Sequence, residues 1–116
     1  MKFKTETKND VTVIRLEEER LDLHFASELK ADLLVLAKIP QSKVLLDMAK
    51  VDYSDSSGLG AILFGIRQMR MSEGSLKLCN VRPRVLTLIK IAKLDNVIES
   101  FDDEEEALES FSARLD

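Results

Sequence analysis

The chain has 116 residues, of which 45% are hydrophobic and 33% are charged, and its formal net charge is −4. This length suits one domain that buries a core without disulfides or metals, and the composition is that of an ordinary globular protein. The negative charge and the absence of a Lys/Arg cluster argue against a nucleic-acid partner. The single cysteine, Cys79, cannot form an internal disulfide, which suits a reducing compartment. No stretch has the pattern of a signal peptide or a membrane span, so we expect a cytoplasmic protein without membrane insertion.

The first half of the chain alternates between strand and helix patterns. Residues 3–7 and 11–16 predict two strands joined by a polar turn, which is a hairpin. Apolar residues at helical spacing then predict an amphipathic helix that ends near Pro40, because a proline disfavours helix at the residue before it. These residues are Ala26, Leu29, Leu33 and Leu36. Residues 44–48 form a short apolar run that predicts a buried strand. The core stripe of a second helix follows at Leu59, Ile62, Leu63, Ile66 and Met69.

The second half of the chain continues this alternation. Residues 76–79 predict a strand in which Cys79 is a packing residue, and Pro83 suits the first turn of a third helix. Residues 97–101 predict a short strand. The acidic run 102–106 suits either an interaction tail or a last helix, and the capping-box spacing of Asp102 and Glu105 favours the helix. That helix would dock through Leu108, Phe111 and Leu115. We therefore predict one α/β domain over residues 1–116, with a mixed sheet of four to five strands and about four helices.

The most informative segment is Asp55-Ser56-Ser57-Gly58-Leu59-Gly60, between the strand at 44–48 and the helix that follows. The first N–H groups of a helix lack intrahelical partners, and Asp or Ser side chains satisfy them. Capping alone does not explain two adjacent serines framed by an aspartate and two glycines. A phosphate at this place would meet unpaired N–H groups and the positive end of the helix dipole.

This hexapeptide resembles the phosphorylation-site signature of STAS domains, specifically the single-domain anti-sigma factor antagonists. The resemblance covers nearly the whole chain in the family's order. Its other parts are Arg20-Leu21-Asp22 with Ala26 and Leu29, residues 76–81, and Phe101-Asp102 with residues 105–108. Two places depart from the family pattern, because Glu19-Arg20 replaces a glycine that often precedes the Leu-Asp turn and Tyr53-Ser54 is more polar than usual.

The resemblance implies a switch in protein binding. The protein would bind an anti-sigma factor that is also a serine kinase, lose affinity when that kinase phosphorylates Ser56, and be restored by a serine phosphatase. The phosphoacceptor would then have Asp55, Ser57 and Gly58 as immediate neighbours, with Asp22 contributed by the turn before the first helix.

The roles of several residues near the motif stay open. Asp22 suits a helix cap as well as it suits a carboxylate that orients the acceptor hydroxyl or contacts nucleotide-bound magnesium, whereas Asp55 favours the cap. We expect Ser57 to cap the helix and Ser56 to lie before it. Phe64 points away from the core stripe, together with Gly60, Arg67 and Met71. It either packs under a neighbouring helix or belongs to a docking face for the partner.

Two other functions remain as alternatives. Lone STAS domains also serve as regulatory subunits of lipid-transport ATP-binding cassette complexes, with the same helix as docking surface. A small serine hydrolase would need a base, and the only histidine is His24, but the hexapeptide lacks the Gly-x-Ser-x-Gly order.

Asp22, Asp52 and Asp55 lack the spacing of a calcium loop, and the glycines lack the ending of a nucleotide loop. We therefore predict a binding module that is not an enzyme and has neither a cofactor nor a metal.

Overall fold

The computed structural model describes residues 2–112, and within them five strands form one mixed sheet in the order β1-β2-β4-β6-β7. The strands of this sheet are β1 Phe3–Lys8, β2 Val11–Leu16, β4 Lys43–Asp47, β6 Ser75–Cys79 and β7 Ser100–Phe101. Two shorter strands, β3 Arg20–Leu21 and β5 Tyr53–Ser54, form a separate small sheet. The helices are α1 Leu23–Ala37, α2 Ser56–Met71, α3 Pro83–Ile91 and α4 Glu104–Ser112. The α/β class, the mixed sheet and the helices are confirmed.

Neighbouring strands of the five-stranded sheet are antiparallel at one place only, the opening hairpin. β1 and β2 are antiparallel, and they are joined by Asn9 and Asp10, whose φ angles of 50° and 71° suit a two-residue hairpin turn. The following pairs, β2–β4, β4–β6 and β6–β7, are all parallel. Each of these parallel connections contains one helix, as parallel strands require.

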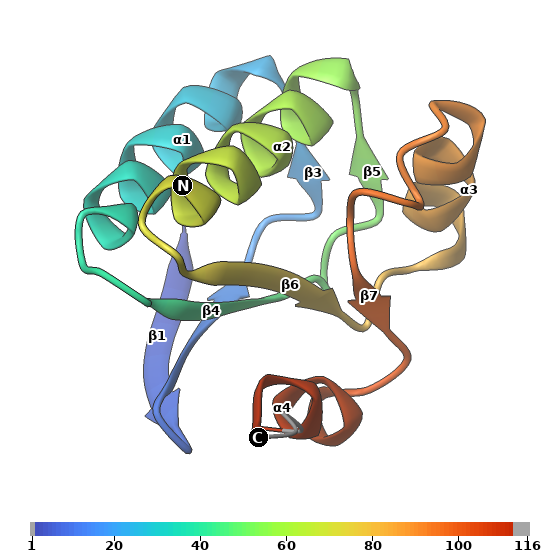
Figure 1. Ribbon diagram of the computed structural model, residues 1–116. Helices are drawn as coiled ribbons and strands as arrows, with labels where there is room; N and C mark the ends of the chain where they lie inside the picture. Colours follow the sequence, from blue (N-terminus) through green and yellow to red (C-terminus); the bar gives the residue numbers. More distant parts are fainter. Residues whose placement is uncertain (1, 113–116) are drawn as a thin grey trace.

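The helices divide between the two faces of the sheet (Figure 1). α1 and α2 lie side by side over one face, and α4 covers part of the other. Side chains of one strand alternate between these faces, so Val44 and Leu46 belong to the larger core under α1 and α2. Leu45 belongs to the smaller core with Cys79, Ala107 and Phe111 of the α4 side. Burial raises the pKa of the Cys79 thiol to about 12, in agreement with its predicted packing role.

Two predictions near the C-terminal end need correction. The strand contains only Ser100–Phe101, because residues 94–98 form a turn in which Ile98 N–H donates to the Leu94 carbonyl. α4 is capped by Asp103 rather than Asp102, since the Asp103 Oδ1 accepts from the Glu106 N–H at 2.8 Å. The acidic run offers the same capping spacing twice, as Asp102 with Glu105 and as Asp103 with Glu106. The helix capped by Asp103 is the one that buries Ala107 and Phe111. Leu115 lies outside the described residues.

Candidate functional site

The hexapeptide forms a corner where β5 leads into α2 beside the beginning of α1 (Figure 1). β3 and β5 run parallel, with Leu21 opposite Ser54. The residues that follow the two strands, Asp22 and Asp55, therefore stand next to each other at two helix starts. The Asp55 N–H donates to the Leu21 carbonyl at 3.3 Å, which extends the pairing into the corner.

The Asp55 carboxylate connects the two helix starts. Its Oδ1 accepts from the Gly58 N–H of α2 at 3.0 Å, and its Oδ2 accepts from the Leu23 N–H of α1 at 3.3 Å. Asp55 is thus the N-cap of α2, the role that its position in the sequence favours. Two backbone donors that lack intrahelical partners share one carboxylate, so this side chain links the first turns of the two helices.

Asp22 is the N-cap of α1. Its Oδ1 accepts from the His24 N–H at 3.1 Å, and its Oδ2 lies 3.8 Å from Nε of Arg20. Of the two roles considered for Asp22, the structure therefore shows the helix cap. The corner thus carries two carboxylates, each occupied by backbone donors of a helix start.

The two serines differ in their access to solvent. α2 begins at Ser56, so the expectation that Ser56 lies before the helix is wrong, as is the expectation that Ser57 provides the cap. Both differences arise because Asp55 is the cap, so the helix starts two residues earlier than a Ser57 cap would allow. Ser56 is exposed and Ser57 is half-buried, and within residues 2–112 neither hydroxyl makes a hydrogen bond. Ser56 is therefore the free, accessible hydroxyl at the corner.

The two glycines of the motif have different surroundings. A Cβ on Gly58 would come within 2.4 Å of both the Leu21 carbonyl oxygen and the Ser54 Oγ. Only glycine lets α2 approach β3 this closely. A Cβ on Gly60 would have no neighbour within 4 Å, so this glycine leaves a bare patch on the outer side of α2.

Phe64 lies at the boundary between α1 and α2. Its ring is half-buried, and the Lys30 ammonium of α1 lies 5.4 Å from the ring centroid. Arg67 and Met71 on the same side of α2 are exposed. Phe64 is therefore neither enclosed under a neighbouring helix nor fully free, and its role in docking stays a prediction.

Other site chemistries gain no support at this corner. Among residues 2–112 no three His, Cys, Asp or Glu side chains gather as a metal site would require. Asp52 turns instead to Arg84, with its Oδ2 3.3 Å from the Arg84 Nη1. The His24 ring packs edge-on against Phe25 at a centroid distance of 4.6 Å. Across residues 2–112, no helix has the length and apolar character needed to cross a membrane.

Sequence reasoning missed one cluster beside the corner. The Tyr53 ring lies near two guanidinium groups, with the Arg20 Cζ 4.2 Å and the Arg84 Cζ 5.8 Å from the ring centroid. More than thirty residues separate Arg20 from Tyr53, and Arg84 is as far again along the chain. Strands of two residues leave no periodicity to find, so no sequence pattern indicates this pairing.

Comparison with known proteins agrees with this architecture. Residues 2–107 match the STAS domain family. The Anti-sigma-B factor antagonist of Bacillus subtilis is 30% identical over 94 residues, which are 81% of this chain and 84% of that protein. An anti-sigma-factor antagonist (STAS) domain protein from Planctomyces limnophilus has the same fold, with a TM-score of 0.87 and 23% identity over 96% of this chain and 98% of that one. Bacillus SpoIIAA in its phosphorylated form matches with a TM-score of 0.69 and 23% identity, over 94% and 98% of the two chains. The chain belongs to the STAS domain family.

Proposed function

We propose that this protein is an anti-sigma factor antagonist whose binding to its anti-sigma factor is switched off by phosphorylation of Ser56. The observation that carries the proposal is the free Ser56 hydroxyl, exposed at a corner where one carboxylate accepts hydrogen bonds from two helix starts. Family membership and the antagonist from Bacillus subtilis support the binding role.

The enzymes that act on Ser56 are part of the same proposal. The anti-sigma factor is itself the serine kinase, and a serine phosphatase restores the binding form. Ser56 is preferred over Ser57 because a kinase must reach the acceptor oxygen, and Ser57 is half-buried. Asp55 holds the backbone that follows Ser56 through its bond to the Gly58 N–H, and Asp22 caps the neighbouring start of α1.

The charge of the phosphate accounts for release of the partner. Phosphorylation adds about −1.5 to −2 charges at neutral pH, beside the capping carboxylates of Asp22 and Asp55. The start of α2 partly compensates this charge, because the N–H groups at a helix start carry a partial positive charge. A partner surface that is acidic or apolar has no such compensation, and apposition of like charges costs several kcal/mol. Phosphorylation should therefore oppose binding and leave the fold in place.

The direct test is phosphorylation by purified anti-sigma factors encoded in the same genome. Calorimetry first identifies the one that binds the unphosphorylated protein. Incubation with that factor and ATP, followed by mass spectrometry of the peptides, should find phosphate on Ser56. Ser57→Ala is the matched control and should still be labelled. Labelling that persists in Ser56→Ala would show that the acceptor has been assigned wrongly.

A further inference from the structure

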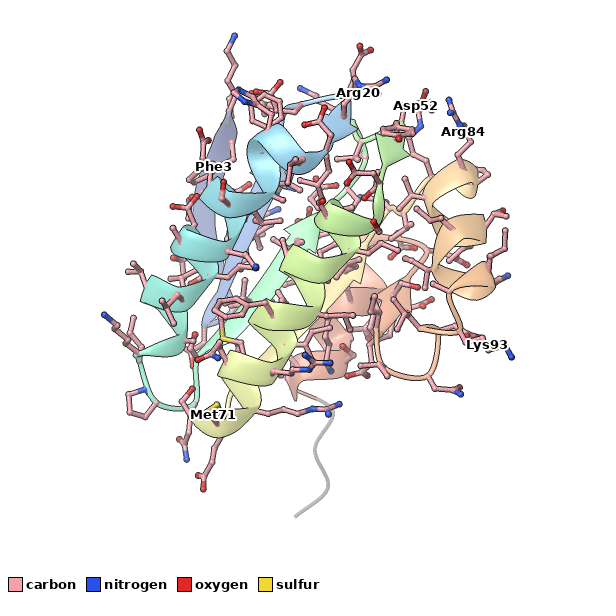
Figure 2. All side chains as sticks on the ribbon, turned by 90° about the horizontal axis from the view of Figure 1, so that it is seen from above. Phe3, Arg20, Asp52, Met71, Arg84 and Lys93 are labelled. Carbon is pink, nitrogen blue, oxygen red and sulfur yellow. The ribbon has the colours of Figure 1, made fainter. Side chains whose placement is uncertain are left out.

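Two arginine side chains from different elements contact the ring of a tyrosine on a third element, next to the corner. Tyr53 lies on β5, Arg20 on β3 and Arg84 on the first turn of α3. Figure 2 shows Arg20, Asp52 and Arg84 along one edge of the molecule, at the opposite end from Met71. We call Arg20, Tyr53 and Arg84 the arginine–tyrosine surface.

Both guanidinium groups of this surface keep most of their hydrogen-bonding capacity. The Arg20 and Arg84 side chains are 63% and 66% exposed. Within residues 2–112, each has one carboxylate nearby, at 3.8 Å from Asp22 and 3.3 Å from Asp52. A guanidinium has five N–H donors in a planar fork, so most donors on each arginine are available to a ligand.

The arrangement suits recognition better than it suits folding stability. Exposed cation–π contacts and exposed ion pairs contribute little to stability. Stacking against Tyr53 does restrict the arginine side chains, so less conformational freedom is lost when a ligand binds. Arginine and tyrosine are also the residues that most often dominate binding energy at protein interfaces. Carboxylates are the groups that such forks bind with two parallel hydrogen bonds.

The surface is continuous with the proposed phosphorylation site. Tyr53 precedes Ser56 by three residues, which span at most about 11 Å even when fully extended. That is close to the Debye length of roughly 8–10 Å at physiological salt. A phosphate on Ser56 would therefore repel an acidic group bound at the arginines.

We propose that the arginine–tyrosine surface binds a segment of the anti-sigma factor that is rich in Asp and Glu, and so selects which anti-sigma factor is recognised. This inference rests on the proposed function. It identifies the chemistry of the partner, and it gives a physical reason for a phosphate at the neighbouring Ser56 to weaken binding.

The test compares charge reversal at this surface with charge reversal elsewhere. The double variant Arg20→Glu/Arg84→Glu should weaken binding of the anti-sigma factor roughly tenfold or more. The double variant Arg70→Glu/Lys93→Glu makes the same change in total charge at exposed positions away from the corner, and should bind within about twofold of the wild type. The double variant Arg20→Lys/Arg84→Lys keeps the charge but loses the planar fork, and should weaken binding several-fold. Affinity is measured by calorimetry at two salt concentrations, and higher salt should weaken the wild type more than the Glu variant.

Each outcome supports or overturns the inference. Equal affinity of the wild type and the Glu variant would overturn it while leaving the proposed function intact. If the wild type binds no anti-sigma factor, the proposed function fails and this inference fails with it. If the Glu variant unfolds, the affinity of the Arg20→Lys/Arg84→Lys variant tests the inference in its place. Several-fold weaker binding by a folded Lys variant supports the inference, and wild-type affinity overturns it. Altered self-association in sedimentation, with unchanged affinity for the anti-sigma factor, would assign the surface to a second copy of the chain and also overturn it.

Discussion

Asp55 is the residue on which the geometry of the corner depends. Its two carboxylate oxygens accept from N–H groups of two different helices, Gly58 in α2 and Leu23 in α1. A backbone donor at a helix start has no intrahelical partner, so each bond satisfies a group that would otherwise need water. The position of the neighbouring Ser56 is thereby tied to both helices.

The stability of this corner can be measured by removing its caps one at a time. Asp55→Ala should lower the free energy of unfolding by about 1–2 kcal/mol, because the loss of an N-cap costs about this much. Asp22→Ala, which removes a cap with one backbone bond, should cost no more than Asp55→Ala. Urea denaturation of both variants is the measurement. A smaller effect for Asp55 than for Asp22 would contradict the bridging role.

The two motif glycines provide a second comparison at the scale of single residues. Gly58→Ala should destabilise the domain by more than 1 kcal/mol or so, since the new Cβ would meet backbone and side-chain oxygens at 2.4 Å. Gly60→Ala enters open space inside a helix, and should be neutral or stabilise by up to about 1 kcal/mol. Thermal unfolding of the pair tests both, and similar midpoints for the two variants would refute the close approach of α2 to β3.

At the scale of elements, α4 is held to the sheet by charges as well as by its apolar side. The Arg15 Nη1 donates to Asp47 at 2.9 Å and also to Glu104, and the Lys8 Nζ lies 2.6 Å from Glu104. The hydrogen bond from Arg15 lowers the pKa of Glu104 to about 2, and Lys8 contributes further. The same contact raises the pKa of Arg15.

This network predicts a defined acid sensitivity. An unfolded glutamate has a pKa of about 4.3, so the lowered pKa of Glu104 stabilises the fold fully above that pH and progressively less as the pH falls towards 2. Glu104→Gln should therefore cost on the order of 2 kcal/mol at pH 7, and the difference from wild type should vanish near pH 2. Glu105→Gln is the matched control at an exposed neighbour. Chemical denaturation across this pH range checks the prediction, and a pH-independent loss in Glu104→Gln would exclude a role for its charge.

Phe64 gives a prediction about α2 and its partner. Because the ring is half-buried, Phe64→Ala should cost roughly 1–2 kcal/mol of stability, less than the roughly 3–5 kcal/mol of an enclosed phenylalanine. If the ring docks the anti-sigma factor, the same variant should weaken binding by more than about 1 kcal/mol. Met71→Ala, on the same side and 79% exposed, is the control. Unfolding and binding are measured on one preparation, and a full core-like loss of stability with unchanged affinity would assign Phe64 to packing.

The element scale also separates what the sequence could predict from what it could not. α1, α2 and the strands β2, β4 and β6 are long enough to show an apolar period or run, and apart from the start of α2 their bounds lie close to the predictions. The start of α2 was ambiguous, because Asp55, Ser56 and Ser57 are all good capping residues. The contact of Gly58 with Leu21 comes from a distant part of the chain and fixes which of the three caps the helix. The pairing of Arg20 with Tyr53 depends on the same long-range contact, so it too was beyond sequence patterns.

At the scale of the whole molecule, the corner and the α4 network belong to different layers. Ser56 starts a helix on the α1/α2 side of the sheet, whereas Glu104 starts the helix on the other face (Figure 1). The larger core lies between the sheet and α1 and α2, and the smaller core lies under α4. A change of charge at Ser56 therefore acts at the edge of one layer and does not meet the ion pairs that hold α4.

This separation predicts that a negative charge at Ser56 changes binding without changing the fold. Ser56→Asp carries one charge where a phosphate carries nearly two, and it should weaken the anti-sigma factor complex about tenfold, or roughly 1.4 kcal/mol. The thermal midpoint should move little, because attraction to the start of α2 and repulsion from Asp55 and Asp22 act in opposite directions on an exposed side chain. Ser56→Asn is the matched control for size without charge, and should bind nearly as the wild type does. Nuclear magnetic resonance spectra should show shifts confined to the corner, with the amides of α4 unchanged. Loss of cooperative unfolding together with the loss of binding would mean that the charge acts by disrupting the fold, and would overturn this account of the switch.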